Sequence, residues 1–316
     1  MKPLRCWVLA LAAIATPVLA AVPDWSAPQV RAAVANQVFT RLRSRVQEKA
    51  PAATQALDRQ VVLSVDVDGT SEPHSVHNYQ GRKVVVPDAF IAKTINIARF
   101  MQLMQGAKDV ECAMSYKSHM EKTGSRTAPE GYLDRAEPAC AMLKARLPLT
   151  QAQELRAQQA LVATLVFAYL HELGHQYQNH GHPPMPYNVT TKENRCAFLR
   201  ARDMQRQLEY EADSFAVATL IHIGEVGLLV ATSNLWLPPP EKDPRLVVPD
   251  GMLSQRLADH PYSPLRFTRI LGQASEALSR QPAQNAELLQ IIREMADVER
   301  RTAAVIADVD AKLNPC

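Results

Sequence analysis

The residues His171-Glu172-Leu173-Gly174-His175 have the types and the spacing that metal-assisted hydrolysis requires. Side chains four positions apart on an α-helix lie on one face about one turn apart, so His171 and His175 can bind the same zinc ion. A zinc ion held by three protein groups keeps a water in its fourth position and lowers the pKa of that water to about 7. Glu172, beside this water, can take its proton and deliver it to a leaving amine. The motif therefore predicts a zinc site that hydrolyses peptide bonds, with Glu172 as the general base.

A long helix is predicted around this motif, over residues 151–180. Thr150 and Gln153 form a capping box at its start, and Gly181 is the first strong stop signal. The apolar block 161–170 is shorter than the roughly 20 residues that span a bilayer, so it indicates a buried helix. The two histidines would then follow a packed segment that restricts their side chains. The alternative is a solvated helix that carries two histidines by chance.

The third ligand of the zinc ion is expected from the next predicted helix. Glu209 and Asp213 are four positions apart and share a face of that helix, whereas Glu211 points elsewhere. We therefore predict Glu209 as the third ligand and Asp213 as an outer hydrogen-bond acceptor that orients a ligand imidazole. Alternatively, these acids form an exposed patch beside nearby basic residues, namely Arg200, Arg202 and Arg206.

In these motifs the chain resembles the HtpX-like and CAAX-prenyl-protease-like zinc metallopeptidases, which belong to the gluzincin group. That family has the His-Glu-x-x-His helix, often with a further His five residues on, which His180 matches, and then Glu-x-x-x-Asp on a second helix. A later His-Pro step, similar to His260-Pro261, leads into an Arg-bearing helix with Arg266 and Arg269. The resemblance extends over residues 151–273.

The resemblance implies one zinc ion per chain, with His171, His175 and Glu209 as its ligands and Glu172 as the general base. It also implies that His260 approaches the open side of the zinc and stabilises the oxyanion. The activity that the resemblance implies is that of a zinc endopeptidase.

Other histidine-based metal sites fit the sequence less well. Metzincins need Gly and His at the positions that Gln178 and Gly181 occupy, so that class is excluded. His180 and His182 could form a cluster with His175, but Gly181 breaks the helix there and no carboxylate joins them. His180 is expected to be a cation at the helix end or a packing residue.

The start of the chain has the features of a signal peptide. Lys2 and Arg5 precede an apolar stretch at residues 7–15, and Val18-Leu19-Ala20 is a typical cleavage sequence. We predict cleavage near Ala20 and a periplasmic or secreted protein, with an uncleaved membrane anchor as the alternative. No transmembrane segment is expected in the mature chain.

The cysteine content agrees with export to an oxidising compartment. Beyond the predicted signal peptide the chain has Cys112, Cys140, Cys196 and Cys316, an even number that can form two disulfides. Three pairings are possible, and the one that we expect joins Cys112 to Cys140 and Cys196 to Cys316.

Composition and charge limit the classes of partner that this protein is expected to have. The net charge is +3 and falls to about +1 without the predicted signal peptide. Basic residues are interspersed with acidic ones and no aromatic-rich basic stripe occurs, so no nucleic-acid partner is expected. The expected partner is a protein or peptide substrate, and no sequence feature specifies an oligomeric state. Hydrophobic residues make up 47% of the chain, which is enough for a packed core.

The predicted fold class is α+β and mainly α, and the resemblance makes it a gluzincin-type domain with a small sheet and helical additions. The expected elements are a helix at 27–50, an antiparallel sheet from 61–67 and 83–86, a helix from Asp88 through Met104, a mixed segment at 107–149, the two metal helices, a Pro-rich loop at 235–251, a helix from Ser263 and a last helix at 284–313. We predict a signal peptide at 1–20, an N-terminal part at 21–150 and a zinc-binding core at 151–316, with the last two in one compact domain.

The predicted function is zinc-dependent cleavage of exported or misfolded envelope proteins. Two alternatives stay open. One is a zinc-bound periplasmic quality-control protein, similar to a chaperone, with little proteolysis. The other is a secreted toxin-type metallohydrolase.

Overall fold

A computed structural model describes residues 23–68, 72–78, 81–105, 109–123, 127–135, 140–181, 191–233, 263–280 and 282–313. These residues are mainly helical with one small sheet, which confirms the mainly α form of the α+β prediction. The chain divides into two compact units, named here unit 1 (Met1–Glu172 and His222–Leu235) and unit 2 (Leu173–Ile221 and Trp236–Cys316). The predicted signal peptide, at residues 1–20, lies outside the described residues.

The sheet of unit 1 has three strands, β1 (Val61–Asp66), β2 (His74–Asn78) and β3 (Gly81–Pro87). Their order is β1-β3-β2, with β1 parallel to β3 and β2 antiparallel to it. The expected antiparallel pairing of residues 61–67 with 83–86 is therefore wrong. The sequence before β3 forms a strand of its own, and this strand reverses the chain so that β3 runs in the direction of β1. Because β2 has a single apolar residue, Val76, its sequence carries little strand signal.

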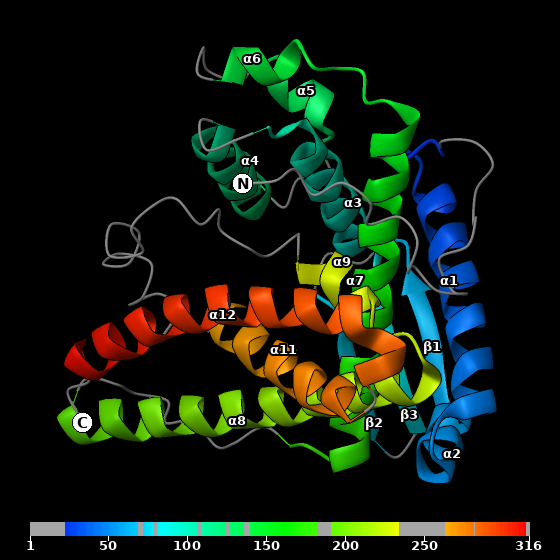
Figure 1. Cartoon of the computed structure of the whole chain (residues 1–316), viewed down its shortest axis with the longest axis vertical. Helices are drawn as coiled ribbons and strands as arrows, with labels where there is room; N and C mark the ends of the chain where they lie inside the picture. Colours follow the sequence, from blue (N-terminus) through cyan, green and yellow to red (C-terminus); the bar gives the residue numbers. More distant parts are fainter. Residues whose placement is uncertain are drawn as a thin grey trace. The chain divides into compact units, whose positions relative to one another are not determined.

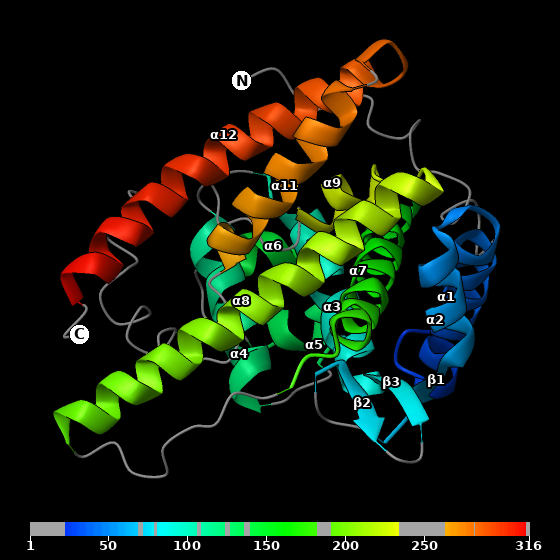
Figure 2. The ribbon, with the colours of Figure 1, turned by 90° about the horizontal axis from the view of Figure 1, so that it is seen from below.

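Three helices accompany the sheet in unit 1 (Figures 1 and 2): α1 (Pro28–Lys49), α2 (Ala52–Gln60) and α3 (Asp88–Leu103). The helices predicted at 27–50 and from Asp88 are confirmed, while α2 was not expected. α1 contacts β1, α2 and α3, and it buries Val34, Val38, Leu42 and Val46, which recur at four-residue steps on one face.

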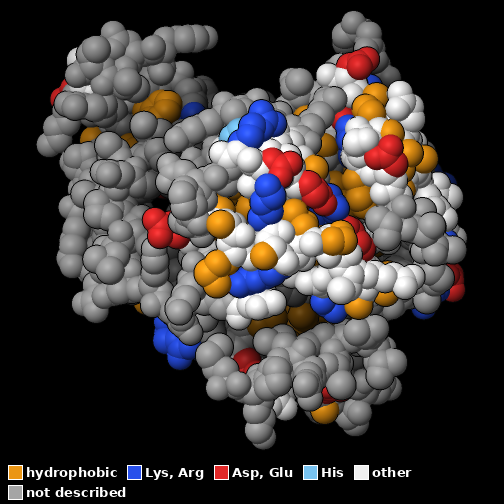
Figure 3. Space-filling view, turned by 90° about the horizontal axis from the view of Figure 1, so that it is seen from above, with side chains coloured by type: hydrophobic (Ala, Val, Ile, Leu, Met, Phe, Trp, Pro, Cys, Tyr) orange, Lys and Arg blue, Asp and Glu red, His pale blue; other side chains and the backbone are white. Residues whose placement is uncertain are grey.

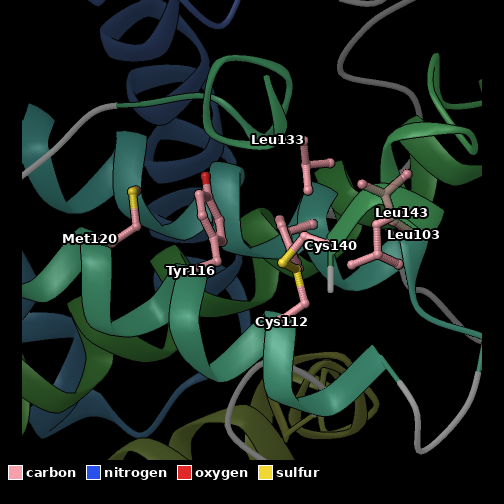
Figure 4. Packing of buried hydrophobic residues seen from close by; sticks show 8 residues of the cluster. Leu103, Cys112, Tyr116, Met120, Leu133, Cys140 and Leu143 are labelled. Carbon is pink, nitrogen blue, oxygen red and sulfur yellow. A yellow bond between two sulfur atoms is a disulfide. The ribbon is translucent and has the colours of Figure 1, made fainter. Parts of the chain in front are cut away.

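The segment predicted as mixed contains three short helices, α4 (Val110–Thr123), α5 (Pro129–Leu133) and α6 (Ala141–Lys144). A disulfide between Cys112 and Cys140 joins α4 to the start of α6, as predicted (Figure 4). Tyr116 packs beside this disulfide and stacks on Phe100 of α3, with the ring centroids 4.3 Å apart. The disulfide thus lies within a hydrophobic cluster that holds the short helices against α3. Cys196 is also disulfide-bonded, and its predicted partner Cys316 lies outside the described residues.

The long helix α7 (Gln151–Gln178) carries the His-Glu-x-x-His motif, and the boundary between the two units falls within it. The predicted capping box is confirmed, because the Thr150 N–H donates to Gln153 Oε1 and the Gln153 N–H donates to Thr150 Oγ1. The helix ends two residues earlier than expected, since Asn179 adopts the left-handed conformation with φ 56°. α9 (Leu228–Ser233) is the last described helix of unit 1.

Unit 2 combines the end of α7 with α8 (Lys192–Ile223), α11 (Ser263–Ser279) and α12 (Pro282–Leu313). α11 and α12 pack together as a helical pair, with Leu271 and Ile292 fully buried. The helix predicted from Ser263 is confirmed, and the last helix begins at Pro282 rather than at residue 284. The Pro-rich loop at 235–251 lies outside the described residues.

The described helices include none whose length and apolar character would allow it to cross a membrane. Among the described side chains that Figure 3 draws, basic and acidic groups are intermixed. This distribution agrees with the interspersed basic and acidic residues of the sequence.

Candidate metal centre

Gly174, the fourth residue of the motif, lies where the end of α7 crosses α8. A Cβ atom on Gly174 would lie 2.9 Å from both the Cα and the carbonyl oxygen of Ala212, and 3.2 Å from Cβ of Phe215. Real Cβ atoms essentially never approach a backbone that closely, so the two helices can meet at this distance only with glycine in the motif. Ala212 is fully buried by the contact. This close crossing brings the acidic face of α8 to the histidines of α7.

His171, His175 and Glu209 form a group whose ligand atoms all lie within 4.8 Å of one another. His171 and Glu209 are buried, and His175 is half-buried. His175 Nε2 lies 3.3 Å from Glu209 Oε1. Two donors bound to one zinc ion at about 2.1 Å in tetrahedral geometry lie about 3.4 Å apart, so this separation fits a shared metal ion. The structure thus brings together the three residues predicted as ligands, and the group could hold a metal ion.

The packing around α7 restricts the histidine at the start of the motif. Leu170 and Leu173, on either side of His171, are fully buried. The ring of Phe167, one turn earlier, stacks against His171 with the centroids 6.3 Å apart. The apolar block that the sequence predicted as buried therefore continues directly into the donor group, and packing limits the orientations of this imidazole.

Two further residues, Glu172 and His260, were predicted to belong to the site. Glu172 is buried on α7 between the two histidines, and its role as general base stays a prediction. His260 lies outside the described residues.

Asp213, one turn after Glu209 on α8, is held by an arginine of α11. Arg266 donates to both carboxylate oxygens, from Nε to Oδ2 at 2.8 Å and from Nη2 to Oδ1 at 2.6 Å. Arg269, one turn further along α11, places its guanidinium 3.8 Å from the ring centroid of Tyr210. These contacts fasten α11 to α8 beside Glu209. The predicted hydrogen bond from a ligand imidazole to Asp213 stays a prediction.

Sequence reasoning missed the contacts of His180 and Glu211. His180 Nδ1 lies 2.9 Å from His175 Nδ1, and His180 Nε2 lies 3.2 Å from Glu211 Oε2. Burial and then the neighbouring His175 lower the pKa of His180, although Glu211 partly opposes this. A lowered pKa disfavours the expected helix-end cation. The resemblance marked His180, because the family often has a histidine five residues after the motif. The sequence alone did not indicate which groups this histidine contacts.

Comparisons of the chain with protein-family models, with curated proteins and with solved structures found no match. The geometry of the donor group is therefore the basis for the function proposed next.

Proposed function

We propose that this chain is a zinc-dependent endopeptidase of the HtpX-like and CAAX-prenyl-protease-like gluzincin type. The observation that carries the proposal is the convergence of His171, His175 and Glu209, with ligand atoms within 4.8 Å of one another. Two imidazoles and one carboxylate are a donor set that catalytic zinc sites use, and three protein ligands leave one position open for water or substrate. Two predicted ligands are buried, and buried donors without competing water bind a cation more strongly.

When bound, zinc supplies Lewis-acid polarisation of the scissile carbonyl and lowers the pKa of the attacking water. Glu172 accepts the proton of that water and transfers it to the departing amine. His260 stabilises the oxyanion, a role taken from the family resemblance. His171, His175 and Glu209 hold the ion, while the crossing at Gly174 keeps their helices together.

Exported or misfolded envelope proteins are the proposed substrates, in the periplasm or outside the cell. The disulfide between Cys112 and Cys140 supports this compartment, since such bonds persist in oxidising environments. The predicted signal peptide would deliver the chain there.

The test combines metal analysis with cleavage of a casein substrate. We expect one zinc ion per purified chain, cleavage that a chelator abolishes, and recovery of cleavage when zinc is added back. Glu172→Gln should keep its zinc and lose roughly 10²- to 10⁴-fold in turnover, because the amide cannot accept the proton. Glu193→Gln, an exposed change in the first turn of α8, is the matched control and should cleave normally.

Normal turnover by Glu172→Gln would end the assignment. A chain that binds zinc but cleaves nothing would instead favour the quality-control protein with little proteolysis. Recovery of the protein from culture medium rather than periplasm would favour the secreted hydrolase.

A further inference from the structure

We infer that His180 and Glu211 position His175 as a metal ligand, through a hydrogen-bonded chain that runs from Glu211 to His180 to His175. The inference rests on the proposed metal site and adds two positioning residues to it. Glu211 and His180 do not belong to the donor group itself.

The two ring nitrogens of His175 face different partners. Nε2 lies 3.3 Å from Glu209 Oε1, on the side of the donor group, and Nδ1 lies 2.9 Å from His180 Nδ1. A neutral imidazole carries one proton, so His175 can offer the Nε2 lone pair to a cation only if its proton is on Nδ1. That N–H then donates to His180 Nδ1, which must be an acceptor. The proton of His180 is consequently on Nε2, where it donates to Glu211 Oε2 at 3.2 Å.

The opposite arrangement of protons is disfavoured by Glu211. If His180 donated from Nδ1 to His175, the lone pair of His180 Nε2 would face the carboxylate, and two acceptors would lie 3.2 Å apart. The carboxylate therefore selects the arrangement in which His175 Nε2 carries no proton and offers its lone pair to a metal ion. Glu211 Oε1 also accepts from Gln207 Nε2 at 3.2 Å, which helps to hold the carboxylate in place.

The end of α7 explains why the two histidine rings meet. Asn179 adopts the left-handed conformation, and the His180 N–H then donates to the His175 carbonyl at 3.1 Å. The same turn that ends the helix thus folds the His180 ring back onto His175. The His180 side chain is only 7% exposed, so little water competes for its hydrogen bonds, while Glu211 at 41% is partly screened.

The experiment measures zinc affinity by competition with a chromophoric chelator and records the visible absorption spectrum of the Co²⁺-substituted full chain. Loss of an outer hydrogen-bond partner of a ligand histidine typically costs 10- to 100-fold in metal affinity, so we expect His180→Ala to weaken zinc binding by roughly that factor. It should also change the Co²⁺ spectrum, because His175 is no longer held in one orientation.

Two conservative variants sharpen the result. His180→Asn keeps an acceptor near the position of Nδ1, and we expect it to recover part of the lost affinity. Glu211→Gln keeps an acceptor without the charge, so its affinity should fall between wild type and His180→Ala. The matched control is His222→Ala, an exposed histidine of α8, which should bind zinc as tightly as wild type. Because Glu211 is partly exposed, Glu211→Gln tests the inference even if His180→Ala fails to fold.

Equal zinc affinity and identical Co²⁺ spectra in wild type, His180→Ala and Glu211→Gln would overturn this inference while leaving the proposed function intact. A wild-type chain that binds no zinc would overturn both.

Discussion

Two buried carboxylates of this protein have very different surroundings. Asp88, at the start of α3, accepts from Arg31 Nε at 2.6 Å and from Arg31 Nη2 at 2.7 Å, and both side chains are almost fully buried. Arg31 also donates to the carbonyl of Ser26 at 3.0 Å, so a further hydrogen bond satisfies the buried guanidinium. Glu209 instead lies 3.3 Å from a ring nitrogen of His175, in a group with His171. A guanidinium has only donors and neutralises the carboxylate permanently. Neutral imidazoles instead offer lone pairs, which together with the carboxylate can coordinate a cation.

The same contrast occurs within α8. Asp213 is one turn from Glu209 and is held at both oxygens by Arg266. One carboxylate of this helix therefore stabilises the packing of α11, and the other belongs to the donor group. The comparison teaches that burial of an acidic residue does not indicate function by itself, because the chemistry of the facing group decides between an ion pair and a metal site.

The largest expected effect is on metal content. Glu209→Gln should reduce bound zinc from about one per chain to near zero, since a neutral amide is a poor ligand for the ion. The unfolding temperature of the metal-free variant should stay close to that of metal-free wild type. Zinc analysis by mass spectrometry checks the first expectation and calorimetry the second. Unchanged zinc stoichiometry would move the ligand role to another carboxylate.

Asp88→Ala should instead reduce stability without altering the donor group. It leaves Arg31 as a buried charge without its carboxylate, which typically costs about 3–5 kcal/mol in the free energy of unfolding. Denaturant unfolding measures the loss. The control is Asp297→Ala, which breaks an exposed pair with Arg300 and should cost less than about 1 kcal/mol. Equal losses in the two variants would contradict the structural role of the buried pair.

Gly174→Ala should weaken both stability and zinc binding, because its Cβ would press on the backbone of α8 at Ala212. Overpacking of this kind costs about 1–3 kcal/mol. Gly272→Ala is a matched control, since a Cβ at this α11 position meets nothing within 4 Å, and it should stabilise the protein by about 0.5–1 kcal/mol. If Gly174→Ala proved as stable and as well metallated as Gly272→Ala, the close crossing of α7 and α8 would be refuted.

The last prediction concerns an effect confined to part of the pH range, at Glu225, a buried carboxylate whose Oε2 has no hydrogen-bond partner among the described residues. Burial raises its pKa from the ordinary 4.5 to about 7, although Arg45 and Lys49 oppose the shift. Because the folded pKa is raised, the ionised form costs folded-state stability. This cost is absent below pH 4.5, grows as the pH rises to about 7, and is constant above that value.

Glu225→Gln should therefore raise the unfolding temperature relative to wild type at pH 8, and this difference should vanish at pH 4. Thermal unfolding across this pH range measures it, with the exposed Glu193→Gln as the control. A difference that does not depend on pH would contradict the raised pKa.

The main helices were predictable because their signals are local. Thr150 and Gln153 lie within one turn and bond each other, so the start of α7 follows from sequence alone. The buried face of α1 follows from apolar residues that recur at helical spacing. The sheet was predicted less well, because the parallel pairing of β1 with β3 depends on β2, whose residues have weak strand preference.

The candidate site also has one part that local sequence signals determine and one part that they do not. The sequence by itself determined that His171 and His175 share a helix face, since helical periodicity fixes side chains four residues apart. It also indicated the disulfide between Cys112 and Cys140 and the choice of Glu209 over Glu211 for the donor group.

Only the tertiary structure decided which groups meet across helices. It placed Glu209 against His175 through the close crossing at Gly174, and it paired Asp213 with Arg266 from a helix more than fifty residues later. It also brought Glu211 to His180. Such contacts depend on how side chains from separate elements pack, and spacing along one chain does not encode that arrangement locally.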